Sequence, residues 1–159
     1  MQNLLKNKKN LFKILNKFKL KKILIISGKS SFPRNILRQF IRNDNINIYF
    51  KKNRDPEFTE FKKLRKIFLK LNPDIVMGIG GGSVLDLTKV VYVTKKIKKP
   101  NEIFIKDVLT KHPIRQKIIL LPTTAGSGAE ATNFSVMYFR KKKFSISYKI
   151  KKKNNNFNS

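Results

Sequence analysis

The chain has 159 residues and a formal net charge of +28, because 37 lysines and arginines outnumber 9 aspartates and glutamates. That length suits one domain of ordinary size. The absence of cysteine excludes a disulfide scaffold, a cysteine nucleophile and a thiolate metal site, and the single histidine excludes a multi-histidine metal site built by this chain alone.

Two explanations account for the charge. A strongly basic protein can bind nucleic acid. An AT-rich genome can also enrich lysine and asparagine on the surface of an ordinary enzyme. Lysine outnumbers arginine here by 30 to 7, whereas base and phosphate recognition favours the planar fork of arginine. The composition therefore favours genomic bias with no specific nucleic-acid partner, and a basic nucleic-acid-binding module is the less favoured alternative.

Residues 1–22 form a basic segment whose apolar positions recur at helical spacing. A membrane-surface helix and a transit peptide are alternatives. The segment contains no arginine, and we favour a lead-in helix packed on the first strand. The chain has no run of 18 apolar residues and no signal-peptide core, so we expect no membrane partner and a cytoplasmic location.

From residue 23 onward, predicted strands and helices alternate. Strands are expected at 23–27, 46–50, 74–79 and 118–121, and helices are expected to open at 31–33, at 55–57 with Asp55 as the cap, and after the glycines at 80–82. The second of these helices ends at Asn72 and Pro73. This alternation predicts an α/β fold, a Rossmann-like parallel sheet with helices on both faces. Such sheets bind ligands at the carboxyl ends of their strands.

The first glycine-rich loop runs from Gly78 to Ser83, between a predicted strand and a predicted helix. Glycines let the backbone approach a ligand closely, Ser83 can cap the helix, and the unpaired first amides of that helix suit a pyrophosphate. The loop is neither a GxGxxG fingerprint nor a P-loop. A tight turn without a ligand is the alternative.

The second loop spans 121–132 and carries four hydroxyl side chains, two glycines and one carboxylate. Hydroxyls and free amides suit the phosphate, ribose and amide groups of a ligand. The alternative is a turn before a helix that Ser127 caps, with Glu130 completing a capping box.

Together the two loops read GGGSxxDxxK and PTTxGSGxExT, and this pair resembles the iron-containing (group III) alcohol dehydrogenase family. The resemblance covers about residues 20–150, including ILIISGKSSF upstream and 134–138 downstream. It implies an NAD(P)-dependent oxidoreductase that acts on small alcohols or aldehydes, and the GKSSF turn is similar to members acting on phosphonoacetaldehyde. It also implies that residues 23–150 are the dinucleotide-binding domain. Residues 151–159 are a low-complexity stretch rich in lysine and asparagine, and this composition predicts a disordered tail.

By resemblance, the family's helical C-terminal domain, with an Asp and three His that bind iron or zinc, lies beyond this sequence. His112 matches none of these ligands, and we interpret it as a surface residue. We therefore expect the chain alone to be inactive. Either the chain is a truncated cofactor-binding half of the enzyme, or a second chain supplies the rest. That second half, or a homo-oligomer, is the expected partner, and a non-catalytic dinucleotide-binding remnant is the alternative.

The resemblance assigns a set of cofactor-binding residues. Gly81, Gly82 and Ser83 would hold the pyrophosphate, Thr123, Thr124 and Ser127 would line the cofactor, Lys143 would approach a ribose, and Asn53 aligns loosely with a family asparagine. Asp86 and Lys89 match motif positions, with helix and loop support as the alternative role. Where NAD-preferring members carry an Asp after the first strand, this chain has Lys29 between Gly28 and two serines. That replacement predicts a preference for NADP.

Overall fold

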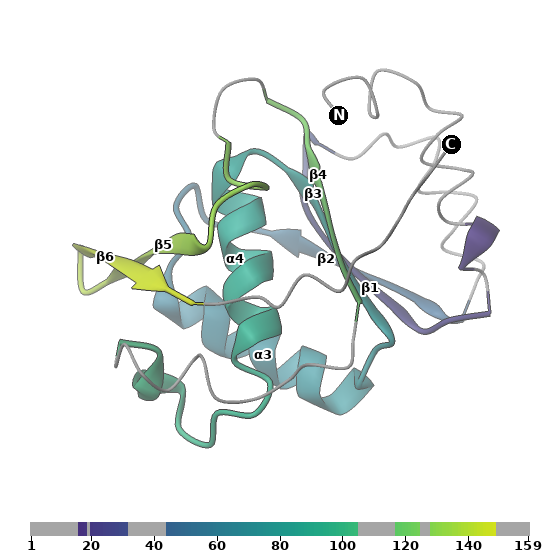
Figure 1. The fold of residues 1–159 in the computed structure, drawn as a ribbon, viewed down its shortest axis with the longest axis horizontal. Coiled ribbons are helices and arrows are strands. Elements are labelled where there is room, and N and C mark those ends of the chain that lie inside the picture. The colour runs from purple at the N-terminus through teal and green to yellow at the C-terminus, as the bar shows by residue number, and fades with distance from the viewer. Residues whose placement is uncertain (1–15, 19, 32–43, 105–116, 125–127, 149–159) are drawn as a thin grey trace.

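The computed structural model describes residues 16–18, 20–31, 44–104, 117–124 and 128–148. Their centre is a four-stranded sheet in the order β2-β1-β3-β4 (Figure 1). The strands are β1 (Ile23–Gly28), β2 (Ile46–Lys51), β3 (Ile75–Gly80) and β4 (Lys117–Pro122). Every pairing in this sheet is parallel, so the carboxyl ends of the four strands lie along one edge.

Two helices cover one face of the sheet, α3 (Phe58–Leu71) and α4 (Gly82–Val93), and a short 3-10 helix spans Pro100–Phe104. The predicted α/β class with a parallel sheet is confirmed. The predicted helix opening at 31–33 and the tail at 151–159 lie outside the described residues, as does most of the lead-in segment 1–22. Among the described residues, no helix is long and apolar enough to cross a lipid bilayer.

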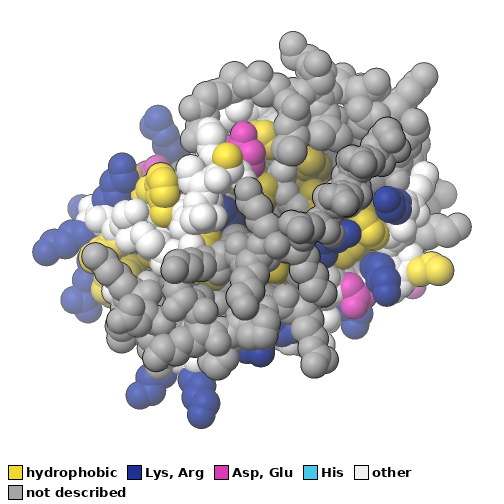
Figure 2. Space-filling view, viewed as in Figure 1, with side chains coloured by type: hydrophobic (Ala, Val, Ile, Leu, Met, Phe, Trp, Pro, Cys, Tyr) yellow, Lys and Arg dark blue, Asp and Glu magenta, His cyan; other side chains and the backbone are white. Residues whose placement is uncertain are grey.

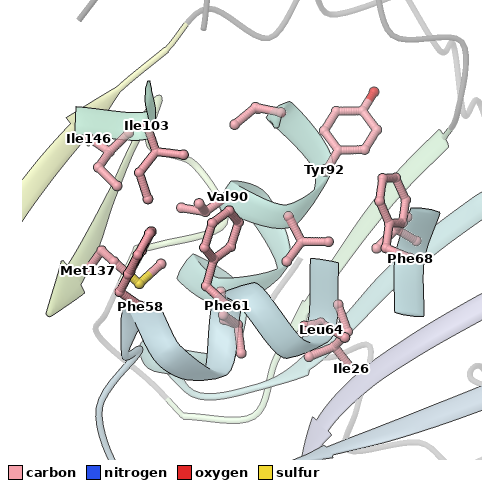
Figure 3. Close-up of a cluster of buried hydrophobic side chains, with 14 of the residues drawn as sticks. Ile26, Phe58, Phe61, Leu64, Phe68, Val90, Tyr92, Ile103, Met137 and Ile146 are labelled. Atoms are coloured by element: carbon pink, nitrogen blue, oxygen red, sulfur yellow. The ribbon is translucent and has the colours of Figure 1, made fainter. Parts of the chain in front are cut away.

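The sheet is buried on both faces because the side chains of β1 and β3 alternate between two apolar clusters. Leu24, Ile26 and Val76 pack against α3 and α4 (Figure 3). Ile23, Ile25 and five other apolar side chains form the cluster on the opposite face. Burial on both faces explains the nearly continuous apolar runs of the central strands.

The apolar stripe of α3 contributes four buried side chains to the larger cluster. Phe61, Leu64 and Phe68 are fully buried, and Phe58 and Phe61 point toward Val90 and Met137 in Figure 3. Burial of one such side chain stabilises the fold by on the order of 2 kcal/mol. Asn72 ends α3 in the left-handed conformation, with φ of 45°, which is a common conformation at helix C-termini. The predicted stop at this residue is confirmed.

The predicted start of α3 is wrong by two residues. Asp55 is not the cap: the helix begins at Phe58, and Glu57 occupies the N-cap position without a side-chain capping bond. The reason lies in tertiary pairing. Pro56 O accepts a hydrogen bond of 2.9 Å from Tyr138 N, and Glu57 forms a parallel bridge with the same tyrosine. This pairing holds residues 56 and 57 in extended conformation.

The second loop leads into a β-hairpin, so the alternative of a helix capped by Ser127 and Glu130 is wrong. Residues 129–131 form a turn, and β5 (Phe134–Phe139) then pairs antiparallel with β6 (Lys142–Ser147). Met137 and Ile146 of the hairpin enter the cluster against the helices. Arg140 and Lys141 both have positive φ, of 48° and 62°, as a tight two-residue hairpin turn requires.

Candidate functional site

The two glycine loops lie side by side at the carboxyl edge of the sheet. Gly80, the last residue of β3, is the register partner of Pro122 in β4. Thr123 N then donates a 3.0 Å hydrogen bond to Gly80 O. The Thr124 side chain faces Gly81 closely enough that a Cβ on that glycine would lie 3.3 Å from Thr124 Oγ1. The structure therefore brings Gly81, Thr123 and Thr124 together, as the paired motifs predict.

The glycines of the first loop divide into two groups. A Cβ at Gly78 would lie 2.6 Å from Thr88 Oγ1, and one at Gly80 would lie 2.7 Å from Val84 Cγ2. These two glycines allow α4 to pack closely on β3. Among the described residues, a Cβ at Gly81 would meet Thr124 alone, with Oγ1 at 3.3 Å and Cγ2 at 3.5 Å. The absence of a side chain at Gly81 therefore lets the two loops approach each other, rather than letting α4 pack on β3.

Helix α4 presents its N-terminus to this edge. Gly81 is the N-cap, in extended conformation with φ of −74° and ψ of 179°, and its carbonyl accepts Val84 N at 2.9 Å. Ser83 lies inside the first turn, so the prediction that it caps the helix is wrong. The amides of Gly82 and Ser83 have no partner within the helix, the first turn contains no acidic residue, and the helix dipole adds partial positive charge. This arrangement suits a phosphate or pyrophosphate group.

Asp86 and Lys89 join α4 to the segment that follows the second loop. Lys89 is fully buried, and its Nζ lies 3.0 Å from Asp86 Oδ1. The same Nζ donates to Ala129 O and Phe134 O, both at 2.7 Å. Asp86 Oδ2 in turn accepts Val136 N at 3.1 Å. Both side chains therefore make the loop-support contacts that the sequence offers as one of their two roles.

The remaining predicted site residues are more dispersed. Lys29 is exposed in the turn after β1, and Asn53 is exposed in the loop after β2, so both follow strands that end at the same edge as the glycine loops. Lys143 is exposed on β6, opposite Tyr138 in the hairpin. Ser127 lies outside the described residues.

A buried polar network holds the loop that carries Asn53, and sequence reasoning did not find it. Glu60 is buried and accepts Lys52 N at 2.6 Å and Asn53 N at 3.3 Å. Lys51 Nζ donates to the carbonyls of Asn53 and Arg54. In the sequence, Glu60 reads as an ordinary acidic residue of a first helical turn, and no local signal marks it as buried.

This network shifts the pKa values of Tyr49 and Lys51. The pKa of Tyr49 is raised to about 12, chiefly because the hydroxyl is buried. The negative charge of Glu60 and the 3.2 Å hydrogen bond that Tyr49 OH donates to Glu60 Oε1 raise it further. Burial lowers the pKa of Lys51, and the nearby acidic groups, Glu60 first among them, partly oppose that shift.

Metal binding finds no support in the part of the chain that the structure describes. No group of three or more His, Cys, Asp or Glu side chains lies together among those residues. His112 is outside them. The donor set needed for iron or zinc is thus not met by the described side chains, whereas the open glycine edge and helix N-terminus fit a dinucleotide pyrophosphate.

Comparison with known proteins decides the family. The family model described as iron-containing alcohol dehydrogenase matches residues 6–156. The chain belongs to the iron-containing alcohol dehydrogenase family. This membership confirms the resemblance carried by the two loop motifs, and it identifies the family as one of oxidoreductases.

Three relatives illustrate the match. A sulfoacetaldehyde reductase of Bilophila wadsworthia is 41% identical over 64 residues, which are 40% of this chain and 16% of that protein. The structure of sulfoacetaldehyde reductase from Bifidobacterium kashiwanohense in complex with NAD+ matches with a TM-score of 0.70 and 25% identity, over 86% of this chain and 38% of that one. An iron-containing alcohol dehydrogenase of Thermotoga maritima shares the fold, with a TM-score of 0.70 and 24% identity over 94% of this chain and 42% of its own. The chain thus spans less than half the length of these relatives.

Proposed function

We propose that this chain binds a nicotinamide dinucleotide at the edge between the two glycine loops. One observation carries the proposal: Gly81, at the N-terminus of α4, lies close to the side chain of Thr124 at the carboxyl ends of β3 and β4. The NAD+ complex of the Bifidobacterium kashiwanohense relative, which shares the fold, supports it. Bound there, the dinucleotide supplies the hydride chemistry of the family.

The chain's own residues have distinct roles in this proposal. The amides of Gly82 and Ser83 hold the pyrophosphate, with Gly81 giving it access. Thr123, Thr124 and Ser127 line the cofactor from the second loop. Lys143 and Asn53 approach it from the hairpin and from the loop after β2, and Asp86 acts through the segment that it holds on α4.

The activity proposed for the enzyme to which this chain contributes is hydride transfer between the dinucleotide and a small alcohol or aldehyde. The names of the sulfoacetaldehyde reductase relatives support a small aldehyde. The remaining catalytic groups would come from outside the described residues, in the same polypeptide or in a partner chain.

The dinucleotide that we propose is NADP(H). The turn after β1 is Gly28, Lys29, Ser30 and Ser31, and it contains no carboxylate to repel a 2′-phosphate. Lys29 and Ser30 are exposed, so an ammonium and a hydroxyl are free to receive one.

Titration of the chain with NADPH and with NADH, followed by nicotinamide fluorescence, tests both the binding of a dinucleotide and the preference for NADP(H). We expect binding of both and a lower Kd for NADPH. Gly81→Val places a branched side chain against Thr124, in a backbone conformation that valine adopts readily. It should raise the Kd of both dinucleotides by about tenfold or more. The absence of binding by either dinucleotide would overturn the proposal.

A charge-reversed pair of variants separates the 2′-phosphate contact from general electrostatics. Lys29→Glu should weaken NADPH and leave NADH almost unchanged. Lys66→Glu makes the same change of charge on the exposed side of α3. It should leave the Kd of NADPH and the Kd of NADH unchanged relative to each other. Tighter binding of NADH than NADPH by the unaltered chain would refute the NADP assignment alone.

A further inference from the structure

Lys89 is a buried cation with an unusually complete set of acceptors. Its side chain is 1% exposed and its Nζ lies 3.0 Å from Asp86 Oδ1. The other acceptors are Ala129 O at 2.7 Å, Phe134 O at 2.7 Å and Thr132 Oγ1 at 3.2 Å. A buried ammonium requires such partners, because burial removes its hydration. Three of these four partners lie in the segment 129–134, which is 40 to 45 positions away along the chain.

This set of contacts anchors one side of the second loop. On the other side, Thr123 N donates to Gly80 O at 3.0 Å, directly before α4. Only four residues separate Thr124 from Ala129. The loop is therefore tied at both sides to the same unit, β3 and α4, and in Figure 1 the start of β5 lies beside α4. The N-terminus of that helix faces Thr124.

We propose that Lys89 is a positioning residue of the dinucleotide site, which holds the second loop in register with the N-terminus of α4. The inference rests on the proposed function. Without the ammonium, the carbonyls of Ala129 and Phe134 lose a donor, and the Asp86 carboxylate loses its cation. The segment 129–134 then leaves α4, and Thr123 and Thr124 no longer face Gly81 in the geometry that a pyrophosphate requires.

Arg65 provides a matched control at the opposite end of α4. It is also a buried cation that donates to backbone carbonyls, those of Thr94 and Ile97. Thr94 follows the last residue of α4, so this contact is about 18 Å from the helix N-terminus by helical rise. Removing either cation destabilises the fold, but only Lys89 contacts the second loop.

The experiment compares Lys89→Met and Arg65→Met with the unaltered chain. The Kd of NADPH is measured by fluorescence under conditions where circular dichroism shows each variant folded, and phosphorus NMR records the resonances of the bound pyrophosphate. We expect Lys89→Met to raise the Kd by about tenfold or more and to shift these resonances. Arg65→Met should leave both unchanged.

Each other outcome has a distinct meaning. Unaltered affinity in Lys89→Met overturns this inference and leaves the proposed function intact, as does an equal loss of affinity in both variants. Failure of the unaltered chain to bind NADPH overturns the proposed function and this inference with it. If Lys89→Met does not fold, Thr132→Val removes one acceptor and should raise the Kd by about threefold; an unchanged Kd in that variant overturns the inference.

Discussion

Lys51, Glu60 and Lys89 are buried charged side chains whose partners are mainly backbone groups of loops. Burial makes an unpaired charge costly, so each of these groups ties its loop firmly to the core. Glu60 holds the loop after β2, and Lys89 holds the segment after the second glycine loop. At the residue scale, the loops at the carboxyl edge are thus held by buried charges on α3, on α4 and at the end of β2.

The Tyr49–Glu60 contact predicts a pH dependence of stability. Tyr49 ionises near pH 10 in the unfolded chain and near 12 in the folded chain. Between these values the unfolded chain releases the proton first, so the contribution of Tyr49 to the free energy of unfolding is complete below pH 10 and falls as the pH rises toward 12. Urea unfolding of the unaltered chain and of Tyr49→Phe between pH 8 and 12 measures this contribution as their difference. A difference that does not change over this range would contradict the assigned shift.

The junction of β3 and α4 is the element on which the candidate site depends. Gly78 and Gly80 bring the helix close to the strand by leaving room for Thr88 and Val84. The helix N-terminus is thereby placed at the sheet edge, where Gly81 lies close to Thr124. Of the three neighbouring glycines in this motif, two therefore serve the packing of α4, and the third faces the second loop.

This division predicts that the same substitution costs more stability at Gly80 than at the adjacent Gly81. Gly80→Ala places a Cβ 2.7 Å from Val84 Cγ2 and 2.8 Å from Val84 Cβ, and should lower the free energy of unfolding by about 1–3 kcal/mol through overpacking. Gly81→Ala meets Thr124 Oγ1 at 3.3 Å and should change stability by less than about 1 kcal/mol. Urea denaturation of both variants measures the contrast, and equal losses would show that Gly81 is also a packing residue.

How far the sequence predicts the elements depends on how local each signal is. The strands at 23–27, 46–50 and 74–79, the stripe of α3 and the stop at Asn72 are written in short-range periodicity and turn chemistry, and the structure confirms them. The juxtaposition of the two loops follows from parallel strand order. The start of α3 and the β5–β6 hairpin were mispredicted or missed, because both depend on pairing and packing with distant segments.

At the scale of the whole molecule, the charge of +28 dominates. On the face shown in Figure 2, the visible lysine and arginine side chains lie on several sides of the periphery rather than in a single patch. Among the described residues, the aromatic rings of Phe58, Phe104, Phe139 and Phe144 pack on one another in the interior and at the hairpin. This distribution differs from the interleaved cations and stacking aromatics of a single-strand-binding surface.

The charge distribution predicts weak selectivity toward nucleic acid. Binding of the chain to two DNA duplexes of unrelated sequence should be equal. The affinity should fall by ~10³- to 10⁵-fold between 50 and 200 mM salt if 6–10 phosphates are contacted. Fluorescence anisotropy across a salt series measures both quantities. A preference of more than about tenfold for one duplex at 200 mM salt would favour the nucleic-acid-binding alternative.

The sequence by itself determined the parallel α/β class, the strand–glycine–helix junction and the paired motifs of the family, because each is encoded in neighbouring residues. Only the tertiary structure decided which glycines pack and which stay open, where α3 begins, and that Lys89 is buried among acceptors up to 45 positions away. The physical reason is that burial and hydrogen-bond pairing are properties of contacts between segments, and a lysine on a helix carries no local sign of the carbonyls that will surround it.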